Sequence, residues 1–123
     1  MPKATGVGGV FWKFRDPQAM AAWYAAHLGI SATPDGSLIF QGPESCGMCV
    51  LGFFPLDTSY FGEGEQKSML NFRVDDLDAL LINLGAAGVR IDPNREDYPY
   101  GRFAWIWDPE GNRVELWQPP ADL

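Results

Sequence analysis

Residues 108–116 read DPEGNRVEL, and this stretch joins a tight turn to a strand. Its first five residues combine proline, glycine and asparagine, which are typical of a hairpin turn. In the strand that follows, Glu115 and Trp117 alternate with Val114 and Leu116. Because neighbouring side chains of a strand point to opposite faces, one face here is apolar and the other carries a carboxylate and a ring.

The rest of the second half of the chain predicts one strand and one helix before this hairpin. Residues 69–74, MLNFRV, alternate as a strand, and Asp75-Asp76 caps a helix that Gly88 ends. The apolar stripe of this helix consists of Leu77, Leu80, Leu81 and Leu84. Three further strands are predicted over residues 90–92, 103–107 and 113–118.

The first half shows the same order of elements. A strand over residues 7–15 leads to Asp16-Pro17, which predicts a helix that ends at Gly29. The stripe predicted for this helix consists of Met20, Trp23, Tyr24, His27 and Leu28. Further strands are predicted around a turn at residues 34–36, over 37–41 and over 48–55, and residues 58–68 form a polar linker. The chain therefore repeats a strand–helix–three-strand pattern.

Composition narrows the function. The 123 residues suit a single domain, and 46% of them are hydrophobic, which is enough for a core. A net charge of −7 without a basic stripe argues against nucleic acid and anionic membranes as partners. Two cysteines and an N-terminus without an apolar signal segment favour a cytoplasmic protein.

The chain resembles the vicinal oxygen chelate superfamily, which includes glyoxalase I, extradiol dioxygenases, fosfomycin-resistance enzymes and bleomycin-binding proteins. The motifs that carry the resemblance are RDP at 15–17, WY at 23–24, HLG at 27–29, NFRVDDLD at 71–78, AAGV at 86–89 and DPEGNRVEL at 108–116. The resemblance implies an α+β fold in which paired βαβββ modules form a curved mixed sheet, or cup, with helices on its outer face. It implies one glyoxalase-like domain over residues 1–123, with modules over about 6–57 and 69–119.

The resemblance also implies where a metal would bind. Metal-dependent members hold a divalent ion with His or Glu at four strand positions, which fall here on Gly9, near Cys49, on Met69 and on Glu115. Only Glu115 is a good ligand for a hard divalent ion, because glycine has no side chain and methionine is soft. We therefore predict no metal and no cofactor.

Alternation predicts which side chains face the cup. Glu115 is the candidate catalytic residue, as a general base or as an anchor for a cationic group; alternatively it is a remnant carboxylate with a neighbouring partner. For Arg73 and Lys13 the alternative, which we favour, is a position at the rim, and the aromatic rings could be plain core. The predicted ligand-binding residues are Phe11, Lys13, Cys49, Phe53, Met69, Asn71, Arg73, Phe103, Trp105 and Trp117.

Three functions remain open from the sequence. The first is binding of a small aromatic or cationic molecule in a metal-free cup, in the manner of bleomycin-resistance proteins. The second is a lyase-, isomerase- or dioxygenase-like enzyme with Glu115 as general base and Asn71 or Arg73 stabilising an anion. The third is a structural or regulatory dimer. A homodimer is expected in any case, because uncharged alanines cover the predicted outer face of the first helix: Ala19, Ala21, Ala22, Ala25 and Ala26.

Overall fold

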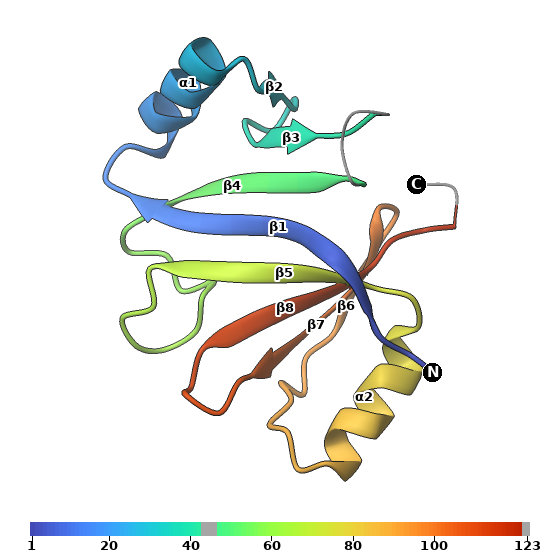
Figure 1. Ribbon diagram of the computed structural model, residues 1–123. Helices are drawn as coiled ribbons and strands as arrows, with labels where there is room; N and C mark the ends of the chain where they lie inside the picture. Colours follow the sequence, from blue (N-terminus) through green and yellow to red (C-terminus); the bar gives the residue numbers. More distant parts are fainter. Residues whose placement is uncertain (43–46, 122–123) are drawn as a thin grey trace. The chain divides into compact units, whose positions relative to one another are not determined.

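The computed structural model describes residues 1–42 and 47–121, which form eight strands and two helices (Figure 1). The elements are β1 Ala4–Phe14, α1 Pro17–Leu28, β2 Ser31–Ala32, β3 Leu38–Phe40, β4 Cys49–Pro55, β5 Ser68–Val74, α2 Leu77–Ala86, β6 Glu96–Tyr98, β7 Gly101–Trp107 and β8 Arg113–Gln118. The order of strand, helix and three strands occurs twice. The predicted α+β fold of two βαβββ modules is therefore confirmed.

The chain divides into two compact units, and β1 contributes to both. The first unit is Gly8–Met69, and the second consists of Met1–Val7 and Leu70–Leu123. In the second unit the N-terminal residues are held beside the end of β5, where Lys3 N donates to Asp75 Oδ1 at 2.8 Å and Thr5 Oγ1 donates to Arg73 O at 3.3 Å. The two units are described separately below.

In the first unit the strand order is β2-β3-β4-β1, with β4 parallel to β1 and the other neighbours antiparallel. Trp12 lies opposite Phe53 in the parallel register. The rings of Trp12 and Phe14 both contact Phe53, at centroid distances of 6.2 and 5.5 Å. Tyr24 of α1 contacts the same ring at 5.8 Å, so α1 covers this face of the sheet.

The ends of α1 are those that the sequence predicts. Asp16 Oδ1 accepts a hydrogen bond from Ala19 N at 3.0 Å, as an N-cap does, and Pro17 follows at the first helical position. Gly29 ends the helix with φ of 68°, a left-handed conformation that favours glycine.

The predicted apolar stripe of α1 is only partly right. Met20, Ala21 and Tyr24 face inward, whereas Trp23 and Leu28 are 49% and 61% exposed. The helix is rotated so that small Ala21 lies against the sheet, and Trp23 instead stacks on His27 at 4.8 Å. Ala21 is therefore not on the outer face, although Ala19, Ala22 and Ala26 are exposed. The homodimer remains a prediction.

In the second unit the order β5-β8-β7-β6 pairs β5 with β8 in parallel and the remaining neighbours antiparallel. Asp76 caps α2 by accepting from Ala79 N, and Gly88 lies just beyond its end with φ of 85°. The core between α2 and the sheet consists of Val74, Leu77, Ala104 and Leu116, with Phe72, Leu80, Leu81, Leu84, Ile106 and Val114 packed around it. The predicted leucine stripe is confirmed.

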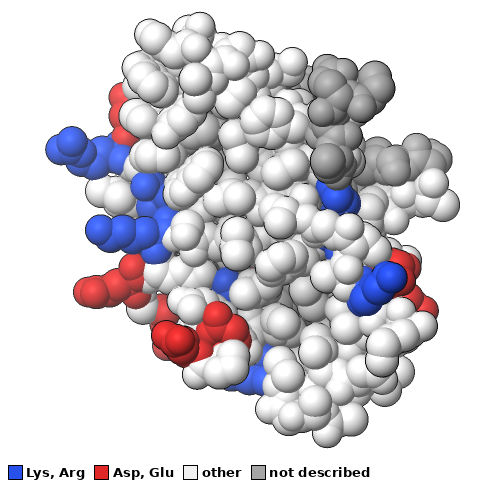
Figure 2. Space-filling model, in the orientation of Figure 1, with Lys and Arg blue, Asp and Glu red and all other residues white. Residues whose placement is uncertain are grey.

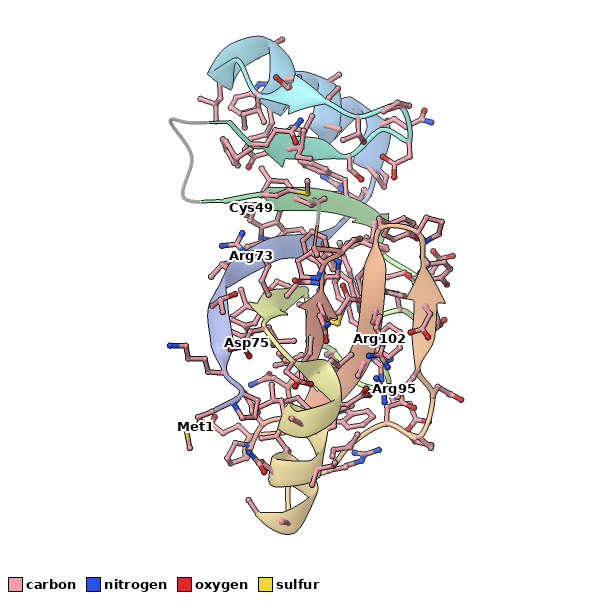
Figure 3. The ribbon with its side chains drawn as sticks, turned by 90° about the vertical axis from the view of Figure 1, so that its right-hand side faces the viewer. Met1, Cys49, Arg73, Asp75, Arg95 and Arg102 are labelled. Atoms are coloured by element: carbon pink, nitrogen blue, oxygen red, sulfur yellow. The ribbon has the colours of Figure 1, made fainter. Side chains whose placement is uncertain are left out.

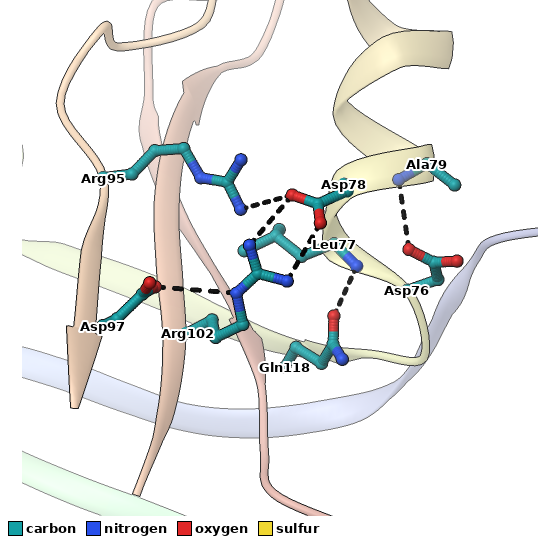
Figure 4. A network of polar contacts seen from close by, with 8 residues as sticks. All are labelled: Asp76, Leu77, Asp78, Ala79, Arg95, Asp97, Arg102 and Gln118. Carbon is teal, nitrogen blue, oxygen red and sulfur yellow. Dashed lines mark hydrogen bonds and ion pairs between the residues drawn. The ribbon is translucent and has the colours of Figure 1, made fainter. Parts of the chain in front are cut away.

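Polar contacts attach α2 to the edge of this sheet (Figure 4). Arg102 of β7 donates to both carboxylate oxygens of Asp78 at 3.0 Å, and Arg95 lies 2.8 Å from the same carboxylate. The Arg102 guanidinium, and then Arg95, lower the pKa of Asp78. Gln118 Oε1 accepts from Leu77 N at 2.7 Å, which satisfies a backbone donor in the first turn of α2. Figure 3 shows Arg95 and Arg102 near one another beside α2.

The edge strand of the second unit differs from its predicted position. The sequence predicts a strand over residues 90–92, but the structure places β6 at Glu96–Tyr98 and gives the earlier segment one isolated bridge, between Ile91 and Ile106. β6 is missed because its side chains are polar and exposed, so its sequence, EDY, carries no apolar alternation.

In the described part of the chain, no helix has the length and apolar character needed to cross a membrane. Lys and Arg side chains lie interspersed with Asp and Glu on the face drawn in Figure 2, which is otherwise mostly uncharged.

Candidate functional site

A line of three polar side chains crosses the second unit on the sheet face opposite α2. The register pairs Asn71 of β5 with Glu115 of β8, and Glu115 with Trp105 of β7. Because paired residues share a face, the three side chains lie next to one another. The predicted cup-facing positions of these three residues agree with the register.

Glu115 is the centre of this line. Its side chain is 1% exposed, and its Oε1 accepts a hydrogen bond from Asn71 Nδ2 at 2.6 Å. Its Oε2 accepts one from Trp105 Nε1 at 2.9 Å. Both donors are neutral N–H groups; the bond from Asn71 is shorter than the usual N–H···O length of about 2.9–3.0 Å, and the bond from Trp105 has that usual length. The side-chain carboxyl group of Glu115 is thus buried and held in one orientation.

In the side-chain amide of Asn71, the nitrogen donates this hydrogen bond and the oxygen has no partner. Asn71 is 2% exposed, and its Oδ1 is buried with no hydrogen-bond partner in the structure. The orientation of the amide follows from chemistry, because only the NH₂ end can donate to a carboxylate. An acceptor therefore lies beside Glu115, buried and unsatisfied.

An aromatic row lies next to the polar line on the same face. Phe103 of β7 is opposite Trp117 of β8, and their rings are stacked at 6.1 Å with planes 5° apart. Tyr98 and Tyr100 each meet Phe103 edge to face, at 6.0 and 5.7 Å, and stack on one another at 5.0 Å. Trp117 is 5% exposed, but the two tyrosines are 45% and 54% exposed. The accessible end of the row is therefore the tyrosine pair, which the sequence prediction missed because it lies within the polar stretch EDYPYG.

An ion pair between Arg113 and Asp92 lies beside Trp105. Arg113 Nη1 lies 2.7 Å from Asp92 Oδ2, and both side chains are 13% exposed. The Arg113 guanidinium also lies over the rings of Trp105 and Trp107, at 5.1 and 5.2 Å. Arg90 lies over Trp107 at 3.8 Å. The Arg113 guanidinium thus packs on the ring of Trp105.

The pair between Asp92 and Arg113 makes stability depend on pH. The hydrogen bond from Arg113, followed by that from Asn94 N, lowers the pKa of Asp92. A lowered carboxyl pKa stabilises the fold above the unfolded value of about 3.9, and this contribution disappears as pH falls through the folded value. We expect Asp92→Asn to lower the free energy of unfolding by about 1–3 kcal/mol at pH 7 and by much less at about pH 3.

Urea titrations of both proteins at the two pH values measure this difference. Glu110→Gln, in an exposed turn, is the matched control and should change stability at neither pH. A loss for Asp92→Asn that stays equal at the two pH values would contradict the expectation.

Arg73, predicted as a ligand donor or rim residue, lies on β5 opposite Trp117. Its Nη1 donates to Val7 O at 3.3 Å. Its guanidinium occupies the space beside Gly6, where an added β-carbon would lie 2.1 Å from Nη2. The backbone of the N-terminal segment therefore positions Arg73.

In the first unit, the sheet face opposite α1 is covered by aromatic rings. Phe11 contacts Phe54 at 5.6 Å and Tyr60 at 6.3 Å. Phe61, which is 1% exposed, meets Phe54 at 5.2 Å, and Lys13 Nζ lies 5.3 Å from the Phe61 ring. The segment predicted as a polar linker thus folds over Phe11 and Lys13. Its rings were missed because polar and glycine residues surround them in the sequence.

Two residues that were predicted to face the cup, Phe53 and Cys49, lie on the other face of the sheet, toward α1. Phe53 lies on the α1 side, where its ring contacts Trp12, Phe14 and Tyr24, so its predicted cup-facing position is wrong. Alternation along β4 places Cys49 on the same side as Phe53. The residues on the opposite side are one position later, at Val50 and Phe54. FFP at the end of β4 offers two adjacent rings, and alternation alone does not decide between them.

The strand positions that resemble a metal site do not fit a divalent ion. A β-carbon on Gly9 would lie 2.5 Å from the Val50 carbonyl oxygen, so the backbone itself leaves no room for a larger side chain there. Met69 is 1% exposed and offers only a thioether. Among the described residues, no group of three or more His, Cys, Asp or Glu side chains could hold an ion.

A family model described as Glyoxalase/Bleomycin resistance protein/Dioxygenase superfamily matches residues 14–116. The chain belongs to this superfamily. The resemblance to vicinal oxygen chelate proteins is thereby confirmed. A comparison with curated proteins gives no match.

Solved structures of superfamily members share the fold. Methylmalonyl-CoA epimerase from Mycobacterium tuberculosis is 27% identical, with 97% of this chain and 91% of that chain covered and a TM-score of 0.68. A variant of the Streptomyces coelicolor epimerase in complex with 2-nitronate-propionyl-CoA is 18% identical, with 97% and 100% covered and a TM-score of 0.70. A superfamily member from Vibrio splendidus 12B01 is 13% identical, with 89% and 95% covered and a TM-score of 0.57. The last two likenesses concern the fold alone.

Proposed function

We propose that this superfamily member binds a small aromatic or cationic molecule on the face of its second unit opposite α2, without a divalent metal. The observation that carries the proposal is the carboxyl group of Glu115, which is 1% exposed and lies between Asn71 and Trp105 beside a row of aromatic rings. A binding site of this kind combines apolar contact area with a few oriented polar groups.

The aromatic row supports a planar or cationic ligand. The exposed rings of Tyr98 and Tyr100 present π-faces and edges that favour stacking and cation–π contacts. The protein's net charge of −7 favours the approach of a cation over that of an anion. The poor fit of Gly9 and Met69 to a metal supports recognition by organic groups instead.

The test is a titration followed by intrinsic tryptophan fluorescence. The probes are a planar aromatic amine, a quaternary ammonium compound and an aromatic carboxylate. We expect saturable binding of the first two and weaker binding of the third. Tyr98→Ala and Tyr100→Ala should each weaken binding about 3–10-fold, because an exposed cation–π or stacking contact contributes roughly 0.5–1.5 kcal/mol. Trp23→Ala is the matched control, since it removes an exposed ring from α1 and should leave affinity unchanged.

The same preparation reports on the metal. Elemental analysis after mild dialysis should give well under one divalent ion per chain, whereas about one Zn, Ni, Mn or Fe per chain would contradict the proposal. Binding that is not saturable, or that Trp23→Ala weakens as much as the tyrosine variants do, would also contradict it. Light scattering of this sample tests the homodimer against the chain mass of 13.6 kDa.

An enzymatic function is the second candidate, and the 27% identity with the Mycobacterium tuberculosis methylmalonyl-CoA epimerase favours it. Glu115 would serve as general base, with Asn71 fixing its orientation. The discriminating assays are exchange of the substrate α-proton with deuterated water, for methylmalonyl-CoA and oxo-acids, and product formation from thiol-adduct and diol compounds. Turnover by the wild type that Glu115→Gln abolishes, with the fold intact, would favour the enzyme over the binding protein.

A further inference from the structure

The unpaired oxygen of Asn71 is a feature of the second unit that its fold does not explain. Nearly all buried side-chain polar atoms in native proteins have a partner, and those that have none usually mark a bound water, an ion or a functional site. Asn71 Oδ1 is buried without a partner, although Nδ2 of the same amide is bonded to Glu115. Some donor from outside the chain is expected to occupy this position.

The neighbouring charge indicates which kind of donor. Asn71 Oδ1 is one end of the amide whose other end lies 2.6 Å from the Glu115 carboxylate. In a buried environment an ionised Glu115 carboxylate this near would favour a donor that carries positive charge, because the low local dielectric strengthens the attraction. A neutral donor, such as a hydroxyl group, gains less of this attraction, because it carries a dipole and no net charge.

We propose that Asn71 Oδ1 and Glu115 form a subsite for a primary ammonium group. One N–H of the ammonium donates to Asn71 Oδ1, and its charge is balanced by the carboxylate of Glu115. The subsite deepens the proposed function, on which it rests, because it assigns the cationic part of the ligand to the polar line and the planar part to the aromatic row.

Trp105 supplies a direct probe of the subsite. Its indole N–H donates to Glu115 Oε2 at 2.9 Å, so its ¹H–¹⁵N resonance reports on the charge near that carboxylate. The indole N–H of Trp117 donates instead to Tyr100 O at 2.8 Å and serves as an internal reference next to the aromatic row. Both resonances can be followed in the intact chain.

The experiment titrates ¹⁵N-labelled protein with ammonium and methylammonium chloride. Tetramethylammonium chloride, which has the same charge but no N–H, and sodium chloride serve as controls for charge and ionic strength. We expect a saturable shift of the Trp105 indole resonance with the two N–H cations and none with the controls. Asn71→Ala should weaken methylammonium binding at least about ten-fold, as the loss of a bond to a charged donor does. The exposed Asn83→Ala should have no effect.

The comparison of cations in the wild type stands even if Asn71→Ala fails to fold. A Trp105 response that is absent, or equal for tetramethylammonium and methylammonium, would overturn the subsite and assign the position next to Asn71 to water. If aromatic probes still bind through Tyr98 and Tyr100 in that case, the proposed function survives. If methylammonium shifts Trp105 but aromatic probes do not bind, the subsite stands and the aromatic part of the proposed function fails.

Discussion

Trp105→Ala is expected to lower the free energy of unfolding by about 3–5 kcal/mol, the range typical of a large aromatic residue removed from a core. Trp105 is 2% exposed and lies on a central strand of the second unit. Its removal leaves a cavity, deprives Glu115 of a hydrogen-bond donor and takes away a ring under the Arg113 guanidinium. Denaturant titration of the variant measures the loss.

Two further variants separate these contributions. Trp105→Phe keeps most of the apolar volume but deletes the indole N–H. It should lower the free energy of unfolding by about 1–3 kcal/mol, because buried Glu115 Oε2 loses this hydrogen-bond donor. Trp23→Ala, in which the lost ring is 49% exposed, should cost well under 2 kcal/mol. If Trp105→Ala were no more destabilising than Trp23→Ala, the assignment of Trp105 to the buried face would be wrong.

Alternation and turn chemistry predicted the second unit well for a local reason. The turn at residues 108–112 sets the register of the β7–β8 hairpin, and that register places Trp105 beside Glu115 and Phe103 beside Trp117. Only a few residues separate the two strands, so the short-range pattern is sufficient. The same holds for the caps at Asp16 and Asp76, where the carboxylate bonds a backbone N–H three residues later.

The bond between Asn71 and Glu115 was beyond prediction from the chain alone. The two residues are 44 positions apart and meet through a parallel register between β5 and β8, which no turn determines. The sequence indicated that both face the same side, but neither the bond nor the unpaired Asn71 Oδ1 follows from alternation. Both depend on a distance that only the folded chain sets.

Misplaced residues in the first unit have a different cause. β4 carries Phe53 and Phe54 in succession, and either could face α1 until the register with β1 places Phe53 opposite Trp12. In α1 almost every residue is apolar or small, so the pattern leaves the rotation of the helix undecided. Sequence patterns identify a buried face only where polar residues mark the opposite one.

Gly101→Ala is the second substitution with a large expected effect, because the aromatic row is built against this glycine. A β-carbon there would lie 2.1 Å from Trp117 Nε1 and 2.8 Å from the Gln118 carbonyl oxygen, and φ is 142°. The methyl group must displace Trp117 from its stack on Phe103 and from its bond to Tyr100 O. Positive φ costs about 1–2 kcal/mol and overpacking about 1–3 kcal/mol, so we expect a loss of about 2–5 kcal/mol in denaturant titration.

The matched control separates backbone strain from the clash. Gly111 also has a positive φ, of 86°, but a β-carbon there would meet nothing within 4 Å. Gly111→Ala should therefore show only the backbone cost, about 1–2 kcal/mol. The excess loss in Gly101→Ala measures the packing of Trp117, and the Trp117 indole resonance should shift in that variant alone. Equal losses in the two variants would mean that Trp117 moves aside freely, and that the aromatic row is not rigidly held.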